Sequence, residues 1–169
     1  MPNLFAHQRY QGYVHTLTET AEDYLEAILN VVLEKGYAKT RDVAHELGVR
    51  PPSVVEMFQK LDAIGLVEYR RYEGVVLTPR GRQIAEVIKS RHDTLKRFLT
   101  LIQVPQEIAE KDACAMEHEL SEESIEQIRL FVEFMNTHPA GNEVARDFLT
   151  FYRHQVSSPS PGTTIPSGK

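Results

Sequence analysis

The chain has 169 residues, of which 41% are hydrophobic and 25% are charged, and its formal net charge is −5. This balance is typical of a globular protein and excludes a globally disordered chain, and the length suits one ordinary domain or two small ones. No apolar run reaches the roughly 18 residues that a membrane-spanning helix needs, and the first residues lack a signal-peptide pattern. We therefore expect a cytoplasmic protein with no membrane partner.

Two helices separated by glycine stops are predicted near the start of the chain. Thr18 or Thr20 can cap the first helix, whose apolar residues recur at helical spacing until Gly36 ends it. Thr40 can cap a short second helix that Gly48 ends. Only a short break separates this second helix from the next helical segment.

A third helix and a hairpin come next along the chain. Pro51-Pro52 can open the helix because proline is tolerated in a first helical turn. Segments 66–70 and 75–78, separated by a turn around Tyr72-Glu73-Gly74, read as a β-hairpin that Pro79 and Gly81 close. Helical spacing then resumes at 84–102, 108–120 and 121–138, so the expected fold is mainly α with one small hairpin.

Charge is segregated along the chain. Positions 70–97 carry eight basic side chains against three acidic ones, whereas positions 105–135 carry nine acidic side chains against two basic ones. The basic segment and the acidic segment that follows it predict two regions with different functions.

The order of helices and hairpin is that of a winged helix-turn-helix, a fold that reads double-stranded DNA. The second helix of the pair would enter the major groove, and the hairpin would contact the phosphate backbone. The alternative for each single charged residue is an ordinary solvated helix face. The candidate DNA-binding residues are Arg50, Pro52, Ser53, Glu56, Gln59, Lys60, Arg70, Arg71 and Tyr72.

A candidate metal-binding pattern lies in the acidic half. Cys114, Glu117 and His118 stand at i, i+3 and i+4, which places thiolate, carboxylate and imidazole on one helical face. Asp23 and Glu26, also i and i+3, offer two carboxylates from the first helix. Each residue alone has an ordinary structural explanation; Cys114, for example, is then a small buried apolar side chain. A mixed set of oxygen, nitrogen and sulfur donors suits a first-row sensor ion better than a closed structural zinc site.

These segments together resemble the diphtheria toxin repressor family, and most of all its short manganese-transport-regulator branch, over about residues 18–138. The segments that carry the resemblance are Glu22-Asp23-Tyr24-Leu25-Glu26, Gly36-Tyr37-Ala38, Val49-Arg50-Pro51-Pro52-Ser53-Val54-Val55, Gly74-Val75-Val76-Leu77-Thr78, Arg91-His92 and Ala113-Cys114-Ala115-Met116-Glu117-His118-Glu119-Leu120-Ser121. The resemblance implies a homodimer that binds operator DNA and represses metal-uptake genes when metal is plentiful.

The resemblance also implies a ligand set. A primary ion would be held by Asp23, Cys114, Glu117 and His118, and a second by Glu26 and His92 with Glu117 shared. The manganese branch usually has glutamate at the position of Cys114, whereas the iron branch has cysteine there but methionine at the position of Asp23. Since this sequence mixes the two, the expected ion is Mn2+ or Fe2+, with up to two ions per subunit.

The resulting domain plan has five parts. They are an N-terminal flexible extension at 1–17, a winged-helix DNA-binding domain at 18–82, a helical metal-binding and dimerisation domain at 83–140, a C-terminal helical extension at 141–156 and a disordered tail at 157–169. The predicted protein is a metal-dependent repressor with no small organic substrate; the alternative is a winged-helix regulator that responds to a non-metal ligand. An enzyme is not expected, because the sequence has no nucleophile elbow, phosphate-binding glycine loop or His-Glu-x-x-His motif.

Overall fold

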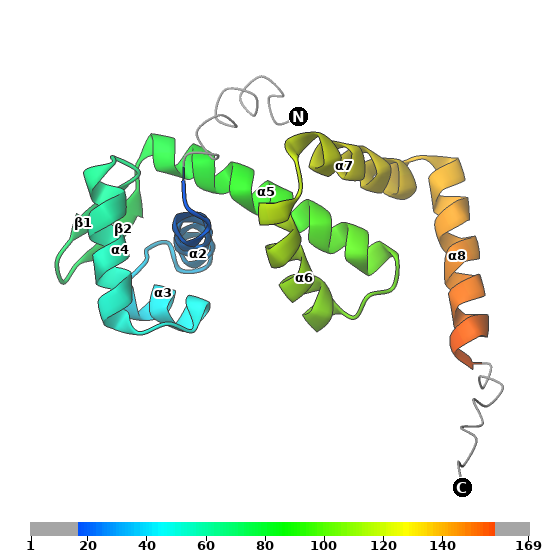
Figure 1. Ribbon diagram of the computed structural model, residues 1–169, viewed down its shortest axis with the longest axis horizontal. Coiled ribbons are helices and arrows are strands. Elements are labelled where there is room, and N and C mark those ends of the chain that lie inside the picture. The colour runs from blue at the N-terminus through cyan, green and yellow to red at the C-terminus, as the bar shows by residue number, and fades with distance from the viewer. Residues whose placement is uncertain (1–16, 158–169) are drawn as a thin grey trace, which may run out of the picture. The chain divides into compact units, whose positions relative to one another are not determined.

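The computed structural model describes residues 17–157, which form seven helices and one two-stranded sheet (Figure 1). The expected N-terminal extension and C-terminal tail lie outside the described residues, apart from Leu17 and Ser157 at their edges. The chain separates into two compact units, with the boundary between Asp93 and Thr94. Within the described range no helix has the length and apolar character needed to cross a bilayer.

The first unit begins with helices α2 (Glu19–Lys35) and α3 (Thr40–Leu47). The Thr18 side chain caps α2 by accepting a hydrogen bond from the Ala21 amide, and Gly36 ends the helix in the left-handed conformation, as the sequence predicts. The expectation that Thr40 caps α3 was wrong by one position. Lys39 is the N-cap, since its backbone is extended and its carbonyl accepts from the Asp42 and Val43 amides.

Helix α4 (Pro51–Ala63) and the hairpin complete the helix-turn-helix and its wing. Strands β1 (Val67–Arg70) and β2 (Gly74–Leu77) pair antiparallel, with Val67 opposite Leu77. The Val75 amide donates to the Ala38 carbonyl at 2.9 Å, which ties β2 to the chain between α2 and α3. Gly74 has a φ of 121°, and a Cβ there would collide with that same carbonyl, so the position requires glycine.

Helix α5 (Pro79–Leu101) starts earlier than the sequence predicts. Pro79 is its first residue rather than the end of the hairpin, because a first helical turn does not need the amide hydrogen that proline lacks. Thr78 accepts a hydrogen bond from the Gly81 amide at 3.0 Å and so caps the helix. A Cβ on Gly81 would collide with the Leu66 carbonyl, so glycine lets α5 start directly against the base of the wing.

One apolar core holds the first unit together. It joins the inward face of α2 to α3, α4, the wing and the first half of α5. Phe58 of α4 is fully buried at its centre, and its ring lies 5.4 Å from that of Tyr69 on β1. The core therefore fixes α4 against both α2 and the wing.

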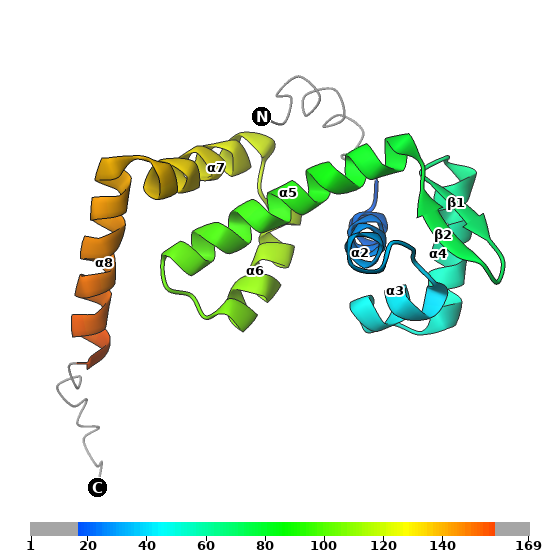
Figure 2. The same cartoon turned by 180° about the vertical axis from the view of Figure 1, so that it is seen from behind.

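The second unit contains the end of α5 with α6 (Gln106–Glu119), α7 (Glu122–Thr137) and α8 (Pro139–Ser157). Leu95 and Leu99 of α5 pack against Ala109 and Ala113 of α6, and Figure 2 shows α6 running at a steep angle to α5. Ser121 caps α7 by accepting a hydrogen bond from the Ser124 amide.

Replacing Phe58 by alanine should lower the free energy of unfolding by about 3–5 kcal/mol, because it leaves a cavity in a fully buried position. Chemical denaturation followed by circular dichroism measures this loss. Gln59→Ala is the matched control, since the neighbouring side chain is exposed and should change stability by no more than about 0.5 kcal/mol. Equal, small losses in both variants would contradict the described core.

Candidate metal centre and nucleic-acid interface

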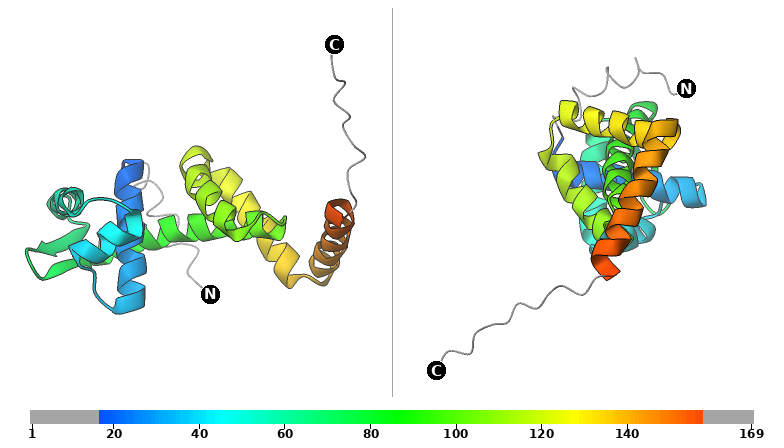
Figure 3. Two further views of the ribbon diagram at one scale, coloured as in Figure 1. Left: turned by 90° about the horizontal axis from the view of Figure 1, so that it is seen from below. Right: turned by 90° about the vertical axis from the view of Figure 1, so that its right-hand side faces the viewer.

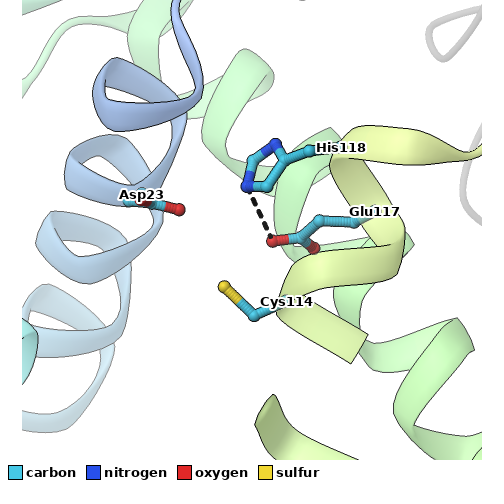
Figure 4. Close-up of side chains that lie close together, drawn as sticks. All are labelled: Asp23, Cys114, Glu117 and His118. Atoms are coloured by element: carbon cyan, nitrogen blue, oxygen red, sulfur yellow. Dashed lines mark ion pairs between the residues drawn. The ribbon is translucent and has the colours of Figure 1, made fainter. Parts of the chain in front are cut away.

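Three metal-ligating side chains project from one face of α6. Cys114, Glu117 and His118 each offer a ligand atom, and these atoms lie within 4.8 Å of one another. Glu117 is buried, with 2% of its surface exposed, and its Oε1 lies 3.6 Å from Nε2 of His118 (Figure 4). The spacing at i, i+3 and i+4 therefore produces the cluster that the sequence predicts.

Two further donors meet inside the first unit. A carboxylate oxygen of Glu26 on α2 and a ring nitrogen of His92 on α5 lie within 4.8 Å of each other. His92 is buried, with 7% of its surface exposed, and Glu26 is partly buried. The packing of α2 and α5 in the common core brings together two residues that are 66 positions apart in the sequence.

Asp23 stands one helical turn before Glu26 on α2 and is partly buried; Figure 4 draws its side chain as sticks on the blue ribbon of α2. The inward residues Tyr24, Leu25 and Ile28 fix the rotation of this helix in the core. Because Asp23 and Glu26 are three residues apart, their carboxylates are neighbours on the surface of α2.

The α6 cluster fits a divalent metal ion by its donors and by its spacing. Ligand atoms bound about 2.0–2.3 Å from one ion can lie no more than about 4.6 Å apart, and Oε1 of Glu117 and Nε2 of His118, at 3.6 Å, satisfy this condition. A carboxylate as deeply buried as that of Glu117 also requires positive charge or hydrogen-bond donors nearby, since burial of a bare charge is costly. Thiolate, imidazole and carboxylate together suit iron, cobalt, zinc or manganese.

The face of α4 that is turned away from the core is polar and exposed. Glu56 and Lys60 form an ion pair at 2.9 Å, and this hydrogen bond lowers the pKa of Glu56 below its usual range. Glu56 is therefore an acceptor at neutral pH. The candidate DNA-binding residues that this helix and its N-cap expose are Arg50, Pro52, Ser53, Glu56, Gln59 and Lys60.

The wing tip exposes the remaining candidates, Arg70, Arg71 and Tyr72. Tyr72 has a φ of 72°, which is rare for a bulky residue, and 88% of its surface is exposed. The Arg71 guanidinium lies 5.2 Å from the Tyr72 ring centroid, and Arg70 pairs with Glu73 at 3.5 Å. A cationic, aromatic tip of this kind has the chemistry to contact a phosphate backbone.

Known proteins resemble the chain over most of its length. It is 41% identical to the HTH-type transcriptional regulator MntR of Geobacillus kaustophilus over 77% of this chain and 92% of that protein. It is 40% identical to the regulator of the same name from Listeria welshimeri, over 79% and 94%.

Two solved structures share the fold. The IdeR structure from T. acidophilum has a TM-score of 0.59 and 33% identity, and the manganese regulator SloR has a TM-score of 0.59 and 25% identity. The matches cover 66% and 68% of this chain but only 52% and 54% of those chains, so the chain spans about half their length.

A winged helix-turn-helix followed by a helical unit with clustered metal donors defines a metal-dependent transcriptional regulator. Residues 16–75 match the iron dependent repressor N-terminal DNA binding domain, and residues 78–146 match the iron dependent repressor metal binding and dimerisation domain. The chain belongs to this family of iron-dependent repressors, whose members are DNA-binding regulators rather than enzymes. The match to a metal-binding domain also decides between the two predicted ligand classes in favour of a metal.

One buried acid near the donors escaped the sequence analysis. Glu22 precedes Asp23 on α2 and exposes only 7% of its surface. Helical spacing could have predicted that Glu22 is buried, because it stands three residues before the buried Leu25.

If Glu117 is a ligand, replacing it by glutamine should weaken metal binding by more than the roughly 10–100-fold that accompanies loss of an outer-shell partner, because the change removes the negative charge of the candidate ligand. Isothermal titration of the purified protein with Mn2+ measures the affinity. Glu119→Gln on the same helix is the control, since that side chain is exposed. An affinity for Mn2+ that is the same in E117Q and E119Q would exclude Glu117 as a ligand.

Proposed function

We propose that Asp23, Cys114, Glu117 and His118 hold one divalent ion, Mn2+ or Fe2+, and that filling this set controls binding to operator DNA. The observation that carries the proposal is the cluster of three donors on α6, within the region that matches a metal-binding domain. The genes controlled would be those for metal uptake, and the protein would act in the cytoplasm, where the chromosome lies.

A second ion per subunit is part of the proposal. Glu26 and His92 offer an oxygen and a nitrogen within 4.8 Å of each other, and Glu117 would supply a shared carboxylate. Carboxylates often bridge neighbouring metal ions, because each has two oxygens that can donate a lone pair to a metal.

The donors support both candidate ions. The thiolate of Cys114 favours ferrous iron, cobalt or zinc, whereas the carboxylates of Asp23 and Glu117 suit manganese. The names of similar proteins include both ions, since SloR is described as a manganese regulator and the family as iron dependent repressors. Anaerobic titration of DNA binding with each ion in turn separates them.

The proposed ligand set draws on both units, and this gives a physical route from metal to DNA. Asp23 and Glu26 stand on α2, whose buried Leu25 and Ile28 belong to the same core as Phe58 of α4. Without positive charge, carboxylates brought together repel one another, and a bound ion supplies that charge. Ligation would thus restrict α2, and with it α4, relative to the second unit; couplings of this kind are typically about 1–3 kcal/mol.

The DNA-reading surface in this proposal consists of α4 and the wing tip. Arg50, Ser53 and Gln59 would reach base edges and phosphates from α4, and Arg71 would bind backbone from the wing. In a homodimer two such surfaces meet successive half-sites, so their separation determines affinity. The metal therefore acts on the separation of the two DNA-reading surfaces rather than on the residues that contact DNA.

Fluorescence anisotropy with a duplex selected in vitro by the metal-loaded protein tests the function. We expect Mn2+ or Fe2+ to strengthen binding by roughly 5–150-fold in the unmodified protein. His118→Ala should remain a folded dimer but lose this response, whereas His154→Ala, an exposed histidine of α8, should keep it. A normal metal response in H118A would overturn the proposed ligand set.

Replacing Arg71 by alanine should weaken DNA binding to a similar extent for every sequence, because a phosphate contact carries no sequence information. The plot of log affinity against log salt concentration should become shallower by about one. Arg153→Ala, which removes an exposed arginine of α8, is the control. An unchanged slope in R71A would exclude the wing tip from the interface.

A further inference from the structure

The turn at the tip of the wing holds a tyrosine in a backbone conformation that this residue rarely adopts. We propose that Tyr72 is a positioning residue for DNA binding, whose ring orients the Arg71 guanidinium toward a phosphate of the operator. This role rests on the proposed function, in which the wing tip lies against DNA. Tyr72 then acts through Arg71 and not through a DNA contact of its own.

The turn itself does not call for tyrosine. It spans Arg70 to Glu73, because the Glu73 amide donates to the Arg70 carbonyl at 3.1 Å. Tyr72 stands at its third position with a φ of 72°, whereas the φ of Arg71 at the second position is not positive. This is the pattern of a type II turn, which favours glycine or asparagine at the third position because other side chains crowd the backbone there.

The Tyr72 ring gains no burial in return for this conformation, since 88% of the residue's surface is exposed. Figure 2 and the left view of Figure 3 show the hairpin at the outer edge of the first unit. The base of the hairpin is fixed, because Val67 and Val75 are buried and the Val75 amide donates to the Ala38 carbonyl. A fixed base holds both ends of the turn and so maintains the strain at its tip. Strain without burial to offset it is typical of functional sites.

Tyr72 contacts Arg71, whose guanidinium carbon lies 5.2 Å from the centroid of the tyrosine ring. A cation–π contact of this kind leaves the five N–H donors of the guanidinium available. Arg70, by contrast, already pairs with Glu73 at 3.5 Å. Of these two arginines at the tip, Arg71 is therefore the one that a ring orients.

An oriented arginine binds a phosphate more tightly than a freely rotating one. The arginine side chain has many rotamers, and fixing them on binding costs conformational entropy. The Tyr72 ring restricts Arg71 before DNA arrives, so less entropy is lost when the phosphate contact forms. A DNA phosphate is the fitting anion, because guanidinium donors match its oxygens and because the hairpin directly follows the helix-turn-helix.

DNA affinity in two variants of Tyr72 tests this role, measured with the selected duplex and the ion, Mn2+ or Fe2+, that promotes binding. Tyr72→Asn removes the ring, so it should weaken binding by about fivefold or more, counted over the two wings of a dimer. Asparagine suits the turn, so the melting temperature should rise by roughly 2 °C. Tyr72→Phe is the matched control: it keeps the ring and should keep the affinity of the unmodified protein.

Three results would overturn the proposal. An unchanged affinity in Y72N would show that the ring has no part in DNA binding. A lower melting temperature in Y72N would make Tyr72 a residue that stabilises the wing itself. A loss of affinity in Y72F as large as that in Y72N would make the hydroxyl a direct DNA contact.

The double variant R71A/Y72N separates positioning from direct contact. Since Tyr72 acts through Arg71 in this proposal, Tyr72→Asn should cause no further loss of affinity when Arg71 is already alanine, and the salt dependence should match that of R71A. Losses that add would contradict it. The metal response of the unmodified protein is measured in the same series, so a failure of metal control is distinguishable from a failure of the wing proposal.

Discussion

The buried carboxylate of Glu117 on α6 imposes the main physical constraint on this protein. A carboxylate exposed as little as that of Glu117, beside an imidazole and a thiol, is costly to keep in place unless positive charge compensates it. A divalent ion held by the proposed ligands would supply that charge in a compact form. The stability of the arrangement on α6 would then depend on the concentration of metal, which is what a sensor requires.

Helix α2 has two roles in this account. Its buried residues, among them Leu25 and Ile28, complete the core that positions α4, and its polar residues Asp23 and Glu26 are proposed metal ligands. The core and the ligands share one rigid helix, so ligation need not deform the helix-turn-helix to influence it. Movement of the whole first unit is enough, because a dimer reads DNA through the distance between its two recognition helices.

Local signals in the sequence predicted most of the fold and part of the site. Thr18 and Ser121 cap helices where their side chains can accept an amide hydrogen, and the i, i+3, i+4 spacing alone predicted the cluster of Cys114, Glu117 and His118. The predicted cap of α3 at Thr40 and the predicted start of α5 after Pro79 were wrong. The start of a helix depends on backbone angles, which neighbouring contacts determine.

Features that depend on tertiary packing could not be predicted in the same way. His92 had no informative neighbours in sequence, and its approach to Glu26 results from the packing of α2 and α5 in one core. The sequence predicts a helical extension at 141–156, but only the burial of its residues shows that the apolar side of α8 is not covered within the described chain.

We propose that an ion held by the second unit also binds the first. Hydrogen exchange measured by mass spectrometry, with and without Mn2+, tests it most directly at the amides of residues 19–26 in α2. The account predicts that metal slows exchange there in the unmodified protein and has no such effect in H118A, in which only the second unit is altered. Exchange in α2 that does not respond to metal, or that slows equally in H118A, would contradict it.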